Sequence, residues 1–246
     1  MPADPLAELL QLDGVTESVN SARAAVDRVL GSRALGRRSA DVSAESALRG
    51  GWASAVLAGA DLSLDDLRRH GPPDPVVHGA LRVNSAVAGL VVAWRRAPRQ
   101  ALARLHALAA ADLIGPDLLG RPSSHSGVAR RLDVLADVLA VTDAPAPVVA
   151  AVVHGEVLAL DAFPPVSGVV ARAAARLTLV ARGLDPKAVI PVEVGHLELR
   201  NEYERALADY RSGTRAGLRG WLVHCADAVQ AGARESLAVC QALARG

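Results

Sequence analysis

The stretch LDAFPPVSGVVAR, residues 160–172, decides the fold that we expect of this chain. It joins two apolar segments that we expect to be helical, residues 148–160 and 168–182, and the first of them has the composition of a buried central helix. Phe163, the one phenylalanine among the 246 residues, lies in the middle of it and is followed by two prolines. Because proline and glycine mark turns, we predict a short loop that leads directly into a helix.

The rest of the sequence has helical periodicity, and no pair of segments alternates as strands would. Hydrophobic residues make up 51% of the chain but aromatic residues only 2%, which favours close helix packing over a β-sandwich. We therefore predict an all-α fold, with Thr16 and Ser63 as helix N-caps and residues 33–39 as a linker. The expected helices cover residues 15–30, 44–58, 63–69, 76–96, 98–111, 128 to the turn at 142–147, 148–160, 168–182, 192–210 and 215–244.

Charge and hydropathy exclude several classes of protein. The net charge of +1 provides no field that would attract nucleic acid. No apolar run reaches the roughly 18 residues that a membrane span needs, and no signal peptide is visible at the N-terminus. Cys225 and Cys240 lie on one predicted helix, roughly 22 Å apart at 1.5 Å per residue, which is too far for a disulfide. We therefore expect a cytoplasmic protein that binds neither nucleic acid nor membranes.

The loop resembles the signature of the Fic (Fido-domain) family, His-x-Phe-x-(Asp/Glu)-Gly-Asn-Gly-Arg-x-x-Arg. Phe163, Gly168 and Arg172 match it. The segments RLHAL at residues 104–108 and NEYERAL at residues 201–207 are similar to other family segments.

This resemblance extends over residues 80–235 and implies a Fic-like helical bundle. We assign residues 76–246 to the Fic-like core and residues 1–75 to an N-terminal helical extension.

The extension contains a second motif with a family frame. Residues 54–59, SAVLAG, follow the pattern of the family's inhibitory helix, Ser/Thr-x-x-x-Glu-Gly/Asn. In the family that Glu pairs with the second Arg of the signature, which corresponds to Arg172 here. Ala58 stands at the Glu position, so the resemblance implies a relict inhibitory helix.

Most of the reactive residues of the signature are replaced. In the family, the His takes a proton from a target hydroxyl as it attacks the α-phosphate of a nucleotide. Asp161 stands at that position, and an aspartate titrates too low to be a good base at neutral pH. Pro165 stands where the family has an acidic metal ligand, and it has no side-chain oxygen. Val166 adds a Cβ to the glycine-rich turn, and Val169 replaces the first Arg. We therefore assign no catalytic residue, and we expect no metal and no cofactor.

A residual anion site remains possible at the start of the second helix. A helix N-terminus at Ser167 and Gly168, with Arg172 one turn inside, is suited to weak binding of a nucleotide or phosphate. The alternative is structural: Ser167 caps the helix, Arg172 pairs with a neighbouring carboxylate, and Asp161 is a capping or salt-bridged surface acid. Phe163 is expected to pack in the core.

Three functions are compatible with these features. The first is a degenerate Fic protein without nucleotidyl transfer, which acts as a binding or regulatory module and meets a protein partner at the former target-docking groove, near residues 123–126. The second is a divergent AMPylation-type nucleotidyltransferase, in which Arg172 and Ser167 hold the donor and Asp161 orients the acceptor. The third is a structural protein that forms a homodimer through its C-terminal helix. The spacing of the seven histidines predicts no metal site.

Overall fold

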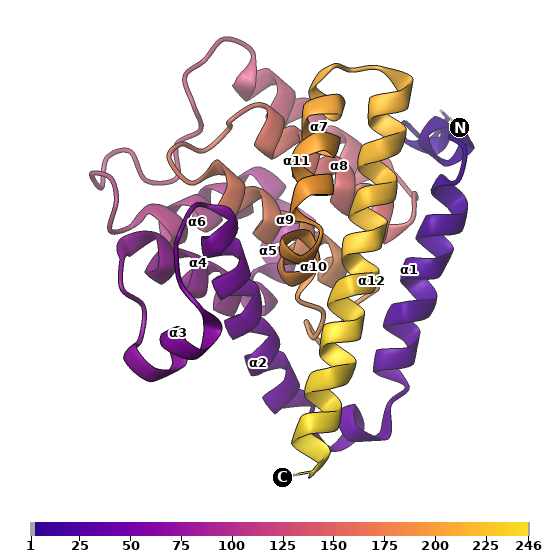
Figure 1. Cartoon of the computed structure of the whole chain (residues 1–246). Helices are drawn as coiled ribbons and strands as arrows, with labels where there is room; N and C mark the ends of the chain where they lie inside the picture. The colour runs from indigo at the N-terminus through magenta and orange to yellow at the C-terminus, as the bar shows by residue number, and fades with distance from the viewer. Residues whose placement is uncertain (1–2, 246) are drawn as a thin grey trace.

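The computed structural model describes residues 3–245 (Figure 1). All regular structure in these residues is helical, which confirms the all-α prediction. The helices are the 3₁₀ helices η1 (Ala7–Gln11) and η2 (Ala88–Leu90) and the α-helices α1 (Val15–Leu30), α2 (Arg33–Leu57), α3 (Leu64–His70), α4 (Pro75–Ala86), α5 (Val91–Arg96), α6 (Pro98–Ala110), α7 (Val128–Val141), α8 (Ala146–Ala159), α9 (Ser167–Ala181), α10 (Val192–Glu198), α11 (Arg200–Arg211) and α12 (Arg215–Arg245).

The pair α8 and α9 forms the centre of the bundle (Figure 1). Every residue of α9 from Val169 to Ala181 is buried. The predicted buried helix over 148–160 is found as α8, although Val152, Glu156 and Leu158 on this helix are only partly buried. Helices α2, α4 and α6 contact α9 from one side, and α12 covers α8 from the other. The loop between α8 and α9 is therefore held between the two most buried helices.

Helices α1 and α12 pack along each other in the same direction at the edge of the bundle (Figure 1). Near their starts, Nε of Arg219 donates to the Asp13 carbonyl over 2.6 Å. Near the end of α1, Val26 and Val29 share a hydrophobic cluster with Val239 of α12. The extension is thus in close contact with the C-terminal helix, and the division of the chain at residue 75 stays a prediction.

The predicted N-caps are right at one helix and wrong at another. Oγ of Ser63 accepts the Asp66 N–H over 3.0 Å, as predicted for the start of α3. Thr16 does not cap α1, because Gly14 precedes that helix with a φ of 76°. The hydroxyl of Thr16 instead donates to the Leu10 carbonyl over 3.0 Å. Gly14, in a left-handed conformation, is therefore the N-cap residue of α1, the position that we had assigned to Thr16.

The predicted linker at residues 33–39 is wrong, because α2 already begins at Arg33. Ser32 is its N-cap, and its Oγ accepts the Leu35 N–H over 3.3 Å. The helix is kinked at Arg38, whose φ of −126° is not helical. The basic and glycine residues of this segment suggested a linker, whereas the serine that follows Gly31 is the stronger local signal.

Two long predicted helices are each broken in the structure. The helix expected over 76–96 is interrupted by η2, where Val87 and Leu90 turn inward and are buried. The two parts, Pro75–Ala86 and Ala88–Arg96, are bent by 56°. Among residues 3–245, no single helix is long and apolar enough to cross a membrane. Only this bent pair, taken together, has the length and the apolar composition of a membrane span.

The helix expected over 192–210 ends at Leu199 and restarts as α11. Residues seven apart on a straight helix lie about 10.5 Å apart along its axis. The break instead brings the rings of His196 and Tyr203 to a centroid distance of 4.7 Å. The bend thus places the Tyr203 ring beside the rings of His154 on α8 and His196 on α10.

Candidate functional site: a buried arginine beside an apolar pocket

Phe163 anchors the loop between α8 and α9. Its side chain is buried, and its ring centroid lies 5.3 Å from that of His106 on α6. Its backbone N–H donates to Oγ of Ser167 over 2.8 Å. Ser167 is thus the first residue of α9 and closes the loop, and no side chain caps this helix. The alternative in which Ser167 is the N-cap of α9 is therefore wrong.

Asp161 lies at the exposed rim of the same loop. Its φ of 45° is left-handed, which an aspartate tolerates better than most residues. Its carboxylate makes no hydrogen bond or ion pair with any other residue between positions 3 and 245. The structure therefore supports neither of the two surface roles, capping or salt bridging, that the sequence suggested.

Arg172 is buried in the second turn of α9, with 2% of its surface exposed. Its Nε donates to Oγ of Ser54 over 3.0 Å, and Nη2 donates to the Ser54 carbonyl over 2.9 Å. Its Nη1 lies 3.4 Å from the Tyr203 hydroxyl. All three partners are neutral, so the predicted pairing of Arg172 with a carboxylate is wrong within the described residues.

Gly168 leaves room for this guanidinium. A Cβ at Gly168 would lie 3.2 Å from Nη1 and 3.3 Å from Nη2 of Arg172. The cationic group therefore folds back over the first turn of α9, where the unpaired backbone N–H groups of the helix already concentrate partial positive charge. The two positive contributions coincide, and they make this end of α9 the most suitable place for an anion in the loop region.

The relict inhibitory motif meets Arg172 in space. Ser54 is fully buried near the end of α2 and supplies two of the arginine's three partners. Ala58 follows one turn later as the C-terminal cap of α2, and it lines the same pocket as Arg172. A carboxylate at position 58 would thus face the guanidinium, whereas the methyl group of Ala58 leaves that space open.

The pocket beside Arg172 has a volume of about 350 Å³ and is mainly apolar. It takes in two of the three predicted anion-site residues, Gly168 and Arg172, but neither Ser167 nor Asp161. Its lining is Leu57, Ala58, Val76, Leu113, Leu158, Pro165, Val166, Gly168, Val169, Arg172, Tyr203, Glu204 and Leu207.

The lining does not fit the divalent cation that the Fic resemblance implies. The side chains of Pro165 and Val169 in this lining are hydrocarbon, whereas Mg²⁺ requires oxygen ligands. Glu204 is the only carboxylate in the lining, and its side chain is exposed. We therefore derive no chemical step through a metal ion at this pocket.

Sequence reasoning missed two of the residues that hold Arg172 in place. Ser54 was assigned to the relict motif but not to the arginine, although the family frame itself contained that signal. Tyr203 was placed only in a family-like segment, residues 201–207. Its hydroxyl lies 2.8 Å from Nε2 of His154 as well as beside Arg172, and burial raises the pKa of the tyrosine. The break at Leu199 that positions Tyr203 has no clear sequence signal.

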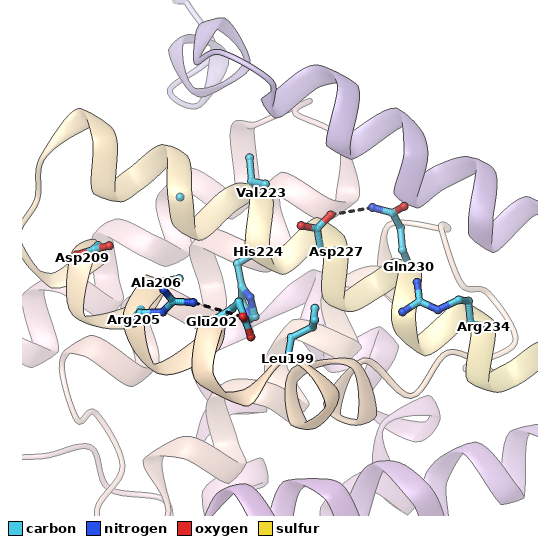
Figure 2. A pocket seen from close by; sticks show the side chains of 11 residues that line it. Leu199, Glu202, Arg205, Ala206, Asp209, Val223, His224, Asp227, Gln230 and Arg234 are labelled. Carbon is cyan, nitrogen blue, oxygen red and sulfur yellow. Dashed lines mark hydrogen bonds and ion pairs between the residues drawn. The ribbon is translucent and has the colours of Figure 1, made fainter.

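A second hollow of about 500 Å³ lies between α11 and α12, away from Arg172 (Figure 2). Two interactions lie within its lining: Nη2 of Arg205 lies 3.3 Å from Oε1 of Glu202, and Nε2 of Gln230 donates to Asp227 over 3.0 Å. His224 lines this α11–α12 groove from α12. Burial lowers its pKa to about 4, so the imidazole is neutral at physiological pH.

Sequence comparison finds no match for the chain, either to a protein-family model or to a curated protein. Structure comparison does. A Fic family protein from Desulfovibrio desulfuricans G20 superposes with a TM-score of 0.75 at 19% identity, over 90% of this chain and 74% of that protein.

Fic-1 from C. elegans superposes with a TM-score of 0.71 at 17% identity, over 93% of this chain and 73% of the Fic-1 chain. Each of these likenesses covers at least 90% of this chain. The chain therefore has the fold of the Fic family proteins, as the signature-like loop predicted.

Proposed function

We propose that this chain is a Fic-fold protein that has lost nucleotidyl transfer and acts as a binding or regulatory module, with a weak site for a phosphate-bearing ligand at Arg172. The observation that carries this proposal is the guanidinium of Arg172, which is buried, held only by neutral partners and open to a pocket. A buried charge without a counter-charge is unfavourable, and an anion in the pocket would supply that counter-charge.

The arrangement supports binding better than catalysis. Asp161 lies outside the pocket lining, so a proton acceptor at that position has no contact with a ligand held by Arg172. Pro165 and Val169, which do line the pocket, can neither hold a metal nor add a second positive charge. A ligand would therefore meet one cation, a helix N-terminus and a hydrocarbon wall.

The protein partner that we propose would bind beside the same loop. The N–H of Ser123 donates to the Ala162 carbonyl over 2.8 Å, so the segment at residues 123–126 is attached directly to the α8–α9 loop. Ser124, His125 and Ser126 are exposed. A ligand that alters the loop would in this way alter the surface presented to the partner. We place this activity in the cytoplasm.

We predict that the chain transfers no nucleotide. The missing base, metal ligand and second cation should each lower the rate by roughly 10² or more. The measurement is transfer of radiolabel from ATP, GTP, CTP or UTP, with and without Mg²⁺, to the chain itself and to a cell lysate. Label that is transferred by the wild type and lost in Asp161→Ala would instead support the rewired transferase.

We predict weak, salt-sensitive binding of inorganic phosphate or a nucleotide at Arg172. A charge-assisted hydrogen bond contributes about 1.5–3 kcal/mol, so Arg172→Gln should weaken binding about tenfold or more. Ala58→Glu, which keeps Arg172, should weaken binding to a similar extent, because the new carboxylate would occupy the space beside the guanidinium. Isothermal titration calorimetry at low and high ionic strength provides the measurement.

The control is Ala238→Glu, which makes the same change at an exposed alanine on α12. It should bind phosphate as the wild type does. Equal binding by wild type, Arg172→Gln and Ala58→Glu would remove the basis for the anion site and leave Arg172 as a structural residue.

A further inference from the structure

Three buried side chains with metal-binding atoms meet beside Tyr203, which also lines the Arg172 pocket. His154 comes from α8, His196 from α10 and Cys225 from α12. Each offers one ligand atom, and these atoms all lie within 4.8 Å of one another. Their exposed fractions are 1%, 2% and 7%, so the cluster belongs to the interior and not to the surface.

A small cavity of about 10 Å³ lies among the three residues. That is at the lower limit of the volume that holds one water molecule. The remaining lining is hydrocarbon, and the short side chains of Ala150, Ala151 and Ala175 leave the space unfilled. Nδ1 of His154 is buried here without a hydrogen-bond partner in residues 3–245. Buried polar atoms are rarely left unpaired, so this nitrogen requires an explanation.

Both imidazoles are held from their other side. Nε2 of His154 lies 2.8 Å from the hydroxyl of Tyr203, and Nδ1 of His196 lies 3.0 Å from Nε2 of His224. Histidines that bind metals almost always have such an outer partner, which fixes the orientation of the ring and the position of its proton. The arrangement leaves Nδ1 of His154 and Nε2 of His196 for an ion.

The protonation states suit a ligand set. Burial lowers the pKa of His154 and of His196 well below the usual range, so both rings are neutral. Burial raises the pKa of the Cys225 thiol, which is therefore protonated when no ion is present. Binding of a divalent ion would displace that proton to solvent and form the thiolate.

We propose that His154, His196 and Cys225 form a buried structural site for one Zn²⁺ ion. Sulfur and imidazole ligands are those that Zn²⁺ prefers. Bond lengths of about 2.0–2.3 Å imply ligand separations of about 3.3–3.6 Å in a tetrahedral site. The side chains would therefore need to close by up to about 1 Å, and the cavity would hold the ion in the space of one water. The thiolate offsets one of the two charges, and the ion ties α8, α10 and α12 together.

The test is titration of the chelator-treated full chain with Co²⁺, which reports a thiolate ligand through its sulfur-to-cobalt charge-transfer absorption, followed by displacement with Zn²⁺. The wild type should bind one ion per chain, and its thermal midpoint should rise with Zn²⁺. Cys225→Ser should lose the absorption band and weaken binding at least tenfold. The matched control is Cys240→Ser, since Cys240 is the other buried cysteine of α12, and it should keep both.

The wild-type titration does not depend on whether the variants fold. Absence of one-to-one Co²⁺ or Zn²⁺ binding at micromolar concentration, or a charge-transfer band that survives in folded Cys225→Ser, would each overturn the proposal.

Discussion

Replacement of Arg176 by methionine should lower the free energy of unfolding by about 3–5 kcal/mol. Arg176 is 1% exposed on α9, and it contacts four other segments: α2, α4, the α9–α10 loop and α10. Its Nη1 donates to Oδ1 of Asn84 over 2.9 Å, and its Nη2 donates to Oγ of Ser46 over 2.7 Å and to the Ala188 carbonyl over 3.0 Å. Nη1 also lies 3.6 Å from Oε2 of Glu193, whose carboxylate oxygens are buried without a hydrogen bond. Methionine would fill much of the volume but leave that carboxylate without a counter-charge.

The same variant should show a characteristic dependence on pH. Burial raises the pKa of Glu193 and raises that of Asp185 to about 6, while the charge of Arg176 lowers both. Loss of Arg176 should therefore raise both pKa values further. A carboxyl group whose pKa is higher in the folded state takes up a proton on folding, so its contribution to stability is present at low pH and is lost as the pH rises through the folded pKa. Urea unfolding should show a smaller loss near about pH 5 than near about pH 8.

Two controls separate the buried charge from a general effect of arginine removal. Arg200→Met breaks an exposed pair with Glu204, in which Nε and Oε1 lie 3.1 Å apart, and should change stability by less than about 0.5 kcal/mol. The double variant Arg176→Met with Glu193→Gln should recover a large part of the loss, because neither charge is then left alone. A loss below about 1 kcal/mol in Arg176→Met at either pH would contradict this account.

A second large effect is expected from Gly195→Ala on α10. A Cβ at Gly195 would lie 2.0 Å from the Ala228 carbonyl oxygen and 2.9 Å from the Ala228 Cα, which are backbone atoms of α12. Backbone cannot move aside as a flexible side chain can, so the two helices would have to separate. We expect a loss of about 3 kcal/mol or more, and a fall in the melting midpoint of roughly 6–12 °C for a chain of this length, measured by differential scanning calorimetry.

The matched control is Gly220→Ala on α12, where an added Cβ would meet no atom within 4 Å. Because glycine is a poor helix former, this change should stabilise the chain by up to about 1 kcal/mol. Opposite signs for one chemical change are the expected result. A stable Gly195→Ala would show that α10 can move away from α12 without loss.

Much of the fold was predictable because it follows from hydrophobic periodicity. The positions of α1, α6, α8, α9 and α12 agree with the pattern to within a few residues, and Ser63 caps α3 as its acidic neighbours suggested. The breaks at Val87 and Leu199 were not predicted, because the single Gly89 in η2 does not by itself end a helix and no proline or glycine adjoins Leu199. They arise from tertiary packing, which turns apolar and aromatic side chains inward and overrides local propensity.

The candidate site was predictable only in part. The sequence identified Arg172 and Gly168, and the structure places both at one pocket. The partners of Arg172 were not predictable from composition, which suggested a carboxylate where the structure has Ser54 and Tyr203. Local motifs specify which residues lie near each other along a helix, but they do not specify which distant helix will face them.

The histidine cluster shows the same limit more sharply. Spacing rules detect ligands that share one helix, and by those rules the seven histidines form no site. His154, His196 and Cys225 lie on three helices and meet only in the folded chain. His154 and Glu156 do point to different faces, as their separation of two requires: His154 is buried, whereas Glu156 pairs with Arg131 near the surface.

The contact between α1 and α12 has a consequence for how the chain is made. Helix α1 ends at Leu30, and the helix that covers its apolar face ends at Arg245. At about 5–20 residues per second, a ribosome needs on the order of 10–40 s to synthesise what lies between them. During that interval α1 can pack only against η1, α2 and α8, which form a small part of its native contacts, and it lacks its main partner, α12. The nascent chain therefore carries a partly uncovered apolar helix until translation of α12 is almost complete, which makes α1 a natural binding site for chaperones during synthesis.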